Sequence, residues 1–215
     1  MNKLIFAAII TTIIYGCDNK DKKTGAVTEK PGIKTDSTLV TDSSWGLINK
    51  NTDFAGLQNI YGNPNVKDER ICGPECIDSL DVTIIFPGKD NEFIVYWEDS
   101  LYHKKIGLIR CYADDAPYHT TKGIKMGTTL SELLSINGKP IAFFGFGWDY
   151  GGSVISLNHG VLEETNVRFT LDLTESGDDN SLSGDTELNS EMPAVKKVQD
   201  KIRVSELLHP LNREH

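Results

Sequence analysis

The sequence predicts an α+β protein made of two tandem units, each a short capped helix packed on antiparallel β-strands. Three observations support this fold class. A helical pattern occurs twice at an offset of 76 residues, each copy precedes segments rich in β-branched and aromatic residues, and tight-turn sequences separate those segments. Tight turns join antiparallel neighbours, and helices set apart from an antiparallel sheet define the α+β class.

The repeat lies between residues 47–64, LINKNTDFAGLQNIYGNP, and residues 123–140, GIKMGTTLSELLSINGKP. Phe54 of the first copy aligns with Leu130 of the second. The copies are identical at Ile48/Ile124, Thr52/Thr128, Leu57/Leu133, Ile60/Ile136, Gly62/Gly138 and Pro64/Pro140. A repeat of this kind indicates that the same supersecondary unit is used twice.

In the first copy we expect Thr52 to cap a helix that Gly62 and Pro64 terminate. Its apolar positions follow the helical period, at Phe54, Leu57 and Ile60.

In the second copy Thr129 and Glu132 have the spacing of a capping box, in which each side chain satisfies a backbone N–H at the helix start. Gly138 suits the left-handed C-cap and Pro140 prevents continuation. The apolar positions again have near-helical spacing, at Leu130, Leu133, Leu134 and Ile136.

Strands are predicted after each helix from runs of β-branched and aromatic residues bounded by turn residues. In the first half they cover 82–86, 92–97 and 107–112, and in the second half 141–146, 153–157, 167–173 and 201–204. Asn158-His159-Gly160 predicts a hairpin between 153–157 and a short strand at 161–163. The tandem units are accordingly placed at residues 45–122 and 123–208.

Residues 175–191, ESGDDNSLSGDTELNSE, form an acidic insertion in the second unit. This composition predicts a mobile surface loop. As a calcium loop it would start at Asp179, but position twelve is then Ser190 instead of glutamate, so it does not match the EF-hand pattern.

The N-terminal sequence predicts a secretory signal and a membrane anchor. Residues 1–17 combine one cation, Lys3, with an apolar run that ends at Tyr15, which is shorter than the ~20 residues that span a bilayer. The ending Ile14-Tyr15-Gly16-Cys17 resembles the lipobox of bacterial lipoproteins, which implies an acylated Cys17 as the mature N-terminus. A soluble secreted protein with an ordinary cleavage region is the alternative.

Residues 18–44 contain few large apolar side chains and predict a flexible polar tether. Asp18 resembles an inner-membrane retention signal, whereas Lys20-Asp21 resembles the export signals of other Gram-negative lineages. We expect a lipid-anchored protein of the bacterial cell envelope, with the outer membrane favoured over the inner.

The charge balance excludes one class of partner. Without the leader, the chain has 21 basic and 31 acidic residues. Such an acidic surface repels nucleic-acid phosphates, so DNA or RNA binding is disfavoured.

The cysteines other than Cys17 are Cys72, Cys76 and Cys111, an odd number, which predicts one disulfide and one free thiol. Cys72 and Cys76 flank a Gly-Pro turn and could close a small loop, but Cys111 could pair with either of them. A zinc site is the alternative, although the spacing lacks the paired ligands of zinc knuckles. We expect no metal and no cofactor.

The segment Gly127-Thr-Thr-Leu-Ser-Glu-Leu-Leu with Asn137-Gly138-Lys139-Pro140 resembles a motif of small outer-membrane assembly lipoproteins and of β-lactamase inhibitory proteins. This resemblance implies a helix packed on a small antiparallel sheet, used in tandem in the inhibitory proteins, and no enzymatic activity. Residues 45–204 also resemble a group of uncharacterised Gram-negative lipoproteins, through the same Asn137–Pro140 string and Gly145–Gly152.

Gly145–Gly152, GFGWDYGG, is the candidate site. Its glycines could expose backbone N–H groups to a phosphate, but neither a following helix nor a nearby lysine supports this hypothesis. We expect the glycines to allow a bend while Phe144, Phe146 and Trp148 pack on the sheet. If the loop is functional, Trp148, Asp149 and Tyr150 would contact a partner protein or a glycan.

These patterns predict a non-catalytic binding or scaffolding module for another envelope protein, of open oligomeric state. The alternative is a surface glycan-binding lipoprotein that uses Trp148, Tyr150 and Trp97. An envelope enzyme dependent on Cys111 or His119 is less favoured, because nothing indicates a third orienting group or a depressed thiol pKa.

Overall fold

The structure is a computed structural model that describes residues 36–73, 76–99, 101–174 and 180–211. The chain divides into two units, residues 1–34 and 35–215, and the described residues belong to the second. The predicted signal segment, Cys17 and residues 18–35 of the predicted tether lie outside the described residues.

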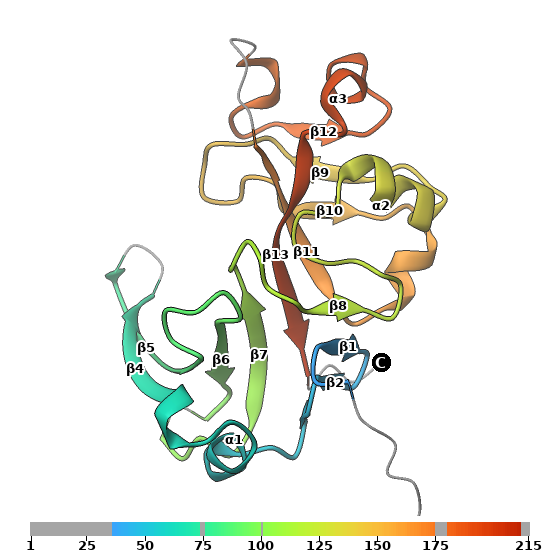
Figure 1. Ribbon diagram of the computed structural model, residues 1–215. Coiled ribbons are helices and arrows are strands. Elements are labelled where there is room, and N and C mark those ends of the chain that lie inside the picture. The colour runs from blue at the N-terminus through green and yellow to red at the C-terminus, as the bar shows by residue number, and fades with distance from the viewer. Residues whose placement is uncertain (1–35, 74–75, 100, 175–179, 212–215) are drawn as a thin grey trace, which may run out of the picture. The chain divides into compact units, whose positions relative to one another are not determined.

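The body is α+β, as the sequence predicts. Its main sheet contains β4 (Val66–Cys72), β5 (Ser79–Ile85), β6 (Phe93–Trp97), β7 (Ile106–Cys111), β11 (Arg168–Leu173) and β13 (Ile202–Pro210). The strand order is β11-β13-β7-β6-β5-β4, and every neighbouring pair is antiparallel. Strand β13 runs beside β7 and joins the strands of the two halves (Figure 1).

Two smaller sheets flank the main one. The first has the order β10-β9-β12, from β9 (Ala142–Phe144), β10 (Val154–Ser156) and β12 (Glu187–Asn189). An isolated bridge between Ser153 and Thr170 links it to β11. The second, of order β3-β2-β1-β8, comprises β1 (Leu39–Thr41), β2 (Ser44–Trp45), β3 (Ile48–Asn49) and β8 (His119–Thr120).

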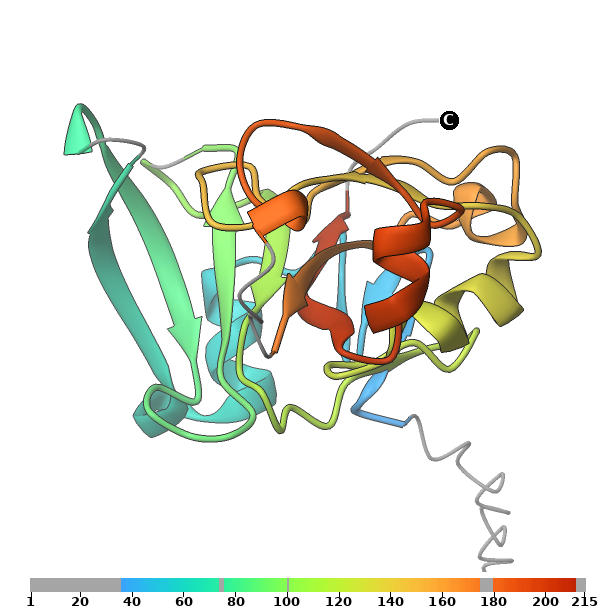
Figure 2. The same ribbon diagram turned by 90° about the horizontal axis from the view of Figure 1, so that it is seen from above.

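The helices are short. They are α1 (Phe54–Tyr61), α2 (Leu130–Asn137) and α3 (Pro193–Val198), with 3-10 turns at η1 (Asn63–Asn65), η3 (Val161–Glu164) and η4 (Asn180–Leu182). Seen from above, the β4–β5 hairpin and α2 lie on opposite sides of the body (Figure 2). No helix among the described residues is long and apolar enough to cross a membrane.

Helix α2 confirms its predicted caps. The Thr129 hydroxyl accepts from the Glu132 N–H at 3.2 Å, and the Glu132 carboxylate accepts from the Thr129 N–H at 2.7 Å. The hydrogen bonds that the Glu132 carboxylate accepts from the Thr129 N–H and, to a smaller extent, from the Thr129 hydroxyl lower its pKa. Gly138 ends the helix in the left-handed conformation at φ 69°.

Helix α1 corrects one prediction, because its N-cap is Asp53 and not Thr52. The Asp53 carboxylate accepts from the Gly56 N–H at 2.9 Å. The Thr52 hydroxyl is already occupied, since it accepts from the Asn49 N–H at 3.1 Å. Asp is as good an N-cap as Thr, so the neighbouring residue takes this role.

The hydrophobic core lies against one side of the main sheet. It joins Leu57 of α1 and Leu130 and Leu133 of α2 to strand residues that are fully or almost fully buried. The strand residues include Val95, Ile109, Leu207 and Phe169. The predicted apolar faces of both helices therefore supply core side chains.

The predicted tether extends too far along the chain. Residues 39–45 form β1 and β2 instead, and Val40 is completely buried. The Asn166 backbone N–H donates to the Asp42 carboxylate, and the Asn166 side-chain amide donates to the Asp42 carbonyl. His209 Nε2 lies 2.6 Å from the Thr41 carbonyl. Burial of Val40 and Trp45, together with these contacts, holds the segment on the body despite its polar neighbours.

The predicted mobile loop at 175–191 is also wrong in its described part, residues 180–191. Leu182 and Leu188 are buried, and β12 pairs with β9. The Ser190 hydroxyl accepts from the Ile141 N–H at 3.0 Å. Two leucines and one buried hydroxyl hold a segment whose overall composition is polar.

Several predicted elements differ from the structure. Residues 161–163 form η3 instead of a strand, although Asn158 and His159 have the positive φ angles of a turn. Strand β4 was not predicted because its charged residues hide the alternation, as is common for edge strands. Helix α3, which begins with Pro193 at its first turn, was not predicted either.

Candidate functional site

The two faces of the main sheet differ in chemistry. Along β6, Phe93, Val95 and Trp97 are buried, whereas Ile94 and Tyr96 between them are partly exposed. Strand β7 alternates in the same way, with Ile109 and Cys111 buried and Leu108 and Arg110 partly exposed. We call the buried side the inner face and the partly exposed side the outer face.

Cross-strand register defines the first row of the outer face. One residue from each of the six strands lies in this row, in the order Lys67, Ile84, Ile94, Arg110, Leu208 and Arg168. Directly paired residues point to the same side of a sheet. The row therefore crosses the whole sheet and joins strands from both halves of the chain.

A second row extends the outer face toward β9. Glu206 pairs with Thr170, Thr170 bridges Ser153, and the Ser153 carbonyl accepts from the Phe144 N–H at 3.0 Å. Trp148 then packs edge-on against Phe144, with ring centroids 5.5 Å apart. The row connects the predicted aromatic loop to the outer face of the main sheet.

Arg110 occupies the centre of the outer face. Its Nε donates to the Glu206 carboxylate, which also accepts from the Thr170 hydroxyl at 3.0 Å. Its Cζ lies 4.9 Å from the ring centroid of Tyr112 and 5.8 Å from that of Tyr96. Burial opposes the charged form, but the hydrogen bond and the charge of Glu206 raise the pKa of Arg110.

Tyr112, which follows β7, places an aromatic ring at the surface and is 43% exposed. Partial burial, the nearby charge of Glu206 and a hydrogen bond with Tyr96 raise its pKa. The phenol is therefore neutral at physiological pH. Tyr96, Arg110 and Tyr112 together form an ordered, half-exposed cluster of aromatic rings around a cation.

A cavity of about 360 Å³ lies between β10 and β11 and reaches Leu208, the residue that pairs with Arg110. Its lining includes Leu208 and Arg168 of the first row and Ser153 and Thr170 of the second. Ile155, which is 41% exposed, adds an apolar wall. The outer face is thus hollowed next to Arg110.

The predicted site residues Trp148, Asp149 and Tyr150 lie together in the β9–β10 loop. Trp148 is partly buried, donates from Nε1 to the Gly145 carbonyl at 2.8 Å, and packs edge-on against Tyr150. Asp149 and Tyr150 are exposed. The bend requires glycine at position 152, because φ is 71° and a Cβ there would lie 1.7 Å from the Leu171 carbonyl oxygen.

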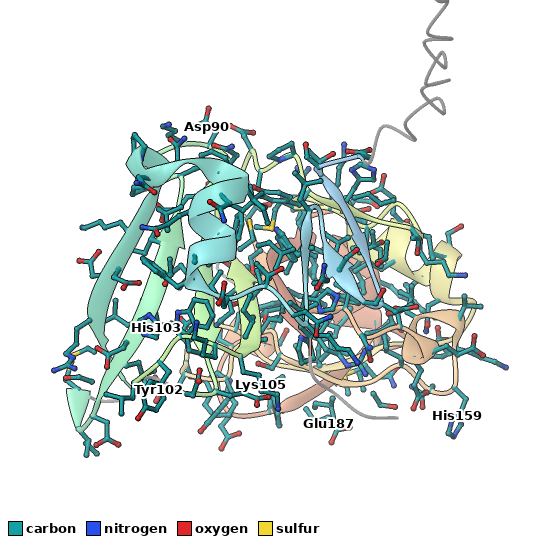
Figure 3. The ribbon with its side chains drawn as sticks, turned by 90° about the horizontal axis from the view of Figure 1, so that it is seen from below. Asp90, Tyr102, His103, Lys105, His159 and Glu187 are labelled. Carbon is teal, nitrogen blue, oxygen red and sulfur yellow. A yellow bond between two sulfur atoms is a disulfide. The ribbon has the colours of Figure 1, made fainter. Side chains whose placement is uncertain are left out.

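The third proposed glycan contact, Trp97, is on the inner side and is only 9% exposed. Its Nε1 donates to the Thr83 hydroxyl at 2.9 Å, and the ring of His103 stacks on it at 4.9 Å. Figure 3 shows His103 beside the outward-pointing Tyr102 in the β6–β7 turn. These contacts cover Trp97, so it does not present a surface to a glycan.

The cysteine pairing that the sequence left open is resolved. Cys72 and Cys76 form a disulfide that closes the end of the β4–β5 hairpin. Cys111 is free and buried on the inner face, where burial raises the pKa of its thiol to about 11.

Cys111 and His119 share no hydrogen bond in the described part of the chain. The Cys111 thiol lies 3.5 Å from the Glu92 carbonyl, and His119 lies 3.8 Å from the Asp36 carboxylate. Among the described residues, no group of three or more His, Cys, Asp and Glu side chains could hold a metal ion.

The Tyr96, Arg110 and Tyr112 cluster was not predicted from the sequence. The sequence pattern that could have indicated it is a spacing of two residues within predicted strands, at Ile94/Tyr96 and at Leu108/Arg110/Tyr112. Such spacing places side chains on one face of a sheet, but which face is buried depends on packing.

No protein-family model and no curated protein matches the sequence. One solved structure with a similar chain is the uncharacterized protein yfeY from Escherichia coli, at 12% identity and a TM-score of 0.49. The match covers 80% of this chain and 99% of that one.

Proposed function

We propose that this chain is a non-catalytic binding or scaffolding module that engages another cell-envelope protein through its outer face. The observation that carries the proposal is the cluster of Tyr96, Arg110 and Tyr112 at the centre of that face. Tyrosine and arginine dominate the residues that contribute most binding energy in protein interfaces, and these residues concentrate near the interface centre.

The cluster is already ordered before a partner binds. The Arg110 Nε group donates a hydrogen bond to the Glu206 carboxylate, and the Thr170 hydroxyl donates another to the same carboxylate. Immobilising a free arginine on binding costs about 0.5–1.5 kcal/mol, which a side chain already held in place largely avoids. An ordered aromatic and cationic surface therefore favours recognition over a purely structural role.

The test compares capture of envelope proteins by the wild-type chain and by a Tyr96→Ser/Tyr112→Ser variant. A Val161→Ser variant is the matched control, because Val161 is 43% exposed on η3. The proposal predicts a partner that wild type and control retain at equal levels and that the double variant loses. Equal retention by all three would contradict it.

The proposal also includes tandem architecture. Helices α1 and α2 have eight residues each at the offset of 76. The Thr52–Asn49 hydrogen bond before α1 is matched by that of the Thr128 hydroxyl with the Lys125 N–H, at 3.0 Å. Strands β4 to β7 follow α1, strands β9, β10, β11 and β13 follow α2, and β7 pairs with β13. These parallels support two copies of one unit joined at their last strands.

Anchoring through Cys17 is proposed from the leader sequence. A lipidated cysteine would tether the body to the membrane of the envelope without a spanning helix. Mass spectrometry of the mature N-terminus tests this proposal. It predicts an acylated Cys17, and an uncleaved Met1 would contradict it.

A second candidate function is glycan capture by the β9–β10 loop. The supporting observation is the exposed pair of rings, with Tyr150 64% exposed and 5.4 Å from Trp148. A glycan array distinguishes this function. Binding by wild type that Trp148→Ala abolishes and Tyr112→Ser retains would favour glycan capture over the protein-binding proposal.

A further inference from the structure

We infer that the outer face recognises a carboxylate-bearing segment of its partner protein, with the carboxylate on the Arg110 guanidinium and a nearby apolar side chain in the cavity beside Leu208. The inference rests on the proposed protein-binding function and specifies the chemistry of the partner.

The first argument is that Arg110 has unused donors. A guanidinium carries five N–H groups in a planar fork. In this structure the Nε group donates to Glu206, and the two terminal nitrogens have no hydrogen-bond partner among the described residues. The side chain is 31% exposed, so these donors are accessible. They require an acceptor, which is either water or a ligand.

The second argument is that the fork is held in a fixed orientation. The Tyr112 and Tyr96 rings flank it at 4.9 and 5.8 Å. Glu206 fixes the Nε edge, and its second oxygen is occupied by the Thr170 hydroxyl. A planar donor pair that is fixed in this way matches the geometry of a bidentate carboxylate.

The third argument concerns charge. The first row contains the cations Lys67, Arg110 and Arg168, although the whole chain has a formal charge of −9. Glu69 pairs with Lys67, Glu206 pairs with Arg110, and Glu163 lines the cavity beside Arg168, so acidic side chains balance these cations. The terminal N–H groups of Arg110 suit one carboxylate, whereas a dianionic phosphate or an anionic membrane is repelled by the acidic body.

The fourth argument gives the spacing of the partner's side chains. Leu208 is paired with Arg110 on the neighbouring strand, and the cavity that Leu208 and Ile155 line begins there. Neighbouring strands are ~4.8 Å apart, and residues i and i+2 of an extended peptide are ~7 Å apart. The inferred motif is therefore an aspartate or glutamate with a leucine- or isoleucine-like residue two positions away, in an extended segment.

The experiment uses the full chain and synthetic peptides as the probe. A random-peptide phage library is selected on the immobilised chain, and the enriched peptides are synthesised in carboxylate form and in isosteric amide form. Each pair is titrated against wild type, Arg110→Lys, Arg110→Gln/Glu206→Gln and Lys122→Gln. Arg110→Lys keeps a charge for Glu206, the double variant removes both charges, and exposed Lys122 is the control for net charge.

We expect enriched peptides to share the acidic and apolar spacing. The amide form should bind wild type and Lys122→Gln at least ~10-fold more weakly than the carboxylate form, as for one charge-assisted bidentate pair. The ratio of the two dissociation constants, that of the amide peptide over that of the carboxylate peptide, should fall several-fold in Arg110→Lys and approach one in the double variant.

Face-binding peptides with no carboxylate preference, or a preference that survives in the double variant, would overturn the inference and leave the proposed protein-binding function intact. Parallel titrations in which a phosphopeptide or anionic vesicles bind more tightly than the carboxylate peptides would also overturn it. Failure to enrich any peptide, together with no loss of envelope capture in Tyr96→Ser/Tyr112→Ser, would contradict both.

Discussion

The inner and outer faces of the main sheet are built from the same strands, yet they use different chemistry. On β6, Phe93 is 1% exposed and contacts Trp45, Tyr61 and Tyr118 through its ring. The next residue, Ile94, is partly exposed and lies beside Arg110. The inner face therefore stabilises the fold through burial, whereas the outer face keeps tyrosine and arginine side chains partly exposed to solvent. Substitutions on the two faces should separate stability from binding.

The largest expected effect is the loss of an inner-face ring. Phe93→Ala should lower the free energy of unfolding by about 3–5 kcal/mol, because it leaves a cavity between three aromatic rings. Ile94→Ala, one residue away on the outer face, should cost about 1 kcal/mol or less. Denaturant unfolding measures both, and equal losses would show that the faces do not differ as described.

A smaller effect is expected when the outer-face ion pair is broken on one side. Arg110→Gln should destabilise by about 2 kcal/mol, because it leaves the Glu206 carboxylate, whose side chain is only 8% exposed, without its cationic partner. Arg110→Gln/Glu206→Gln should recover most of this loss, since no buried charge remains. A double variant less stable than the single one would contradict the assignment of the loss to the unpaired carboxylate.

A fall in pH should lower the free energy of unfolding through protonation of His209, which lies on the inner face. Burial lowers the pKa of this completely buried side chain, whose Nε2 lies 2.6 Å from the Thr41 carbonyl. The pKa of this imidazole is lower in the folded state than in the unfolded state, where it is 6.5. Its contribution to stability is therefore complete above pH 6.5 and is lost as the pH falls below that value. We expect a loss of about 1 kcal/mol toward pH 5.

His209→Asn tests this assignment, because it removes the titrating ring from β13. Unfolding of wild type and variant at pH 7.5 and pH 5 should show a smaller pH dependence in the variant. The other histidines are unchanged in both chains, so an identical pH dependence would exclude His209 as the cause.

The smallest effect on stability is expected at the cavity. Ile155→Ser should change the free energy of unfolding by no more than about 0.5 kcal/mol, because Ile155 is 41% exposed. Partner binding should nevertheless fall, since the substitution places a hydroxyl in the apolar wall. Unchanged binding would remove the cavity from the binding surface.

Local patterns in the sequence were enough to predict much of this fold. The spacing of Leu130 and Leu133, the Thr129–Glu132 capping box and Gly138 predicted α2 correctly, because helix periodicity and caps depend on residues close in sequence. The runs around β6 and β11 were predicted for the same reason. Strand β4 was missed, since its charged side chains only become strand residues through pairing with β5.

The functional site was less predictable than the fold. Trp148 and Tyr150 were identified because aromatic residues between glycines stand out in a sequence. Arg110 and Glu206 are 96 residues apart, so only the pairing of β7 with β13 brings them together. Local alternation also could not show that this side of the sheet would remain partly exposed.

Site-directed photocrosslinking in intact cells tests most directly whether the outer face binds an envelope protein. A photoreactive residue replaces Tyr112 in one chain and Val161, on η3, in another, since both positions are 43% exposed. The account predicts one discrete protein adduct from position 112 that Arg110→Lys diminishes, and none of that mass from position 161. Adducts of the same mass and yield from both positions, or none from position 112, would contradict it.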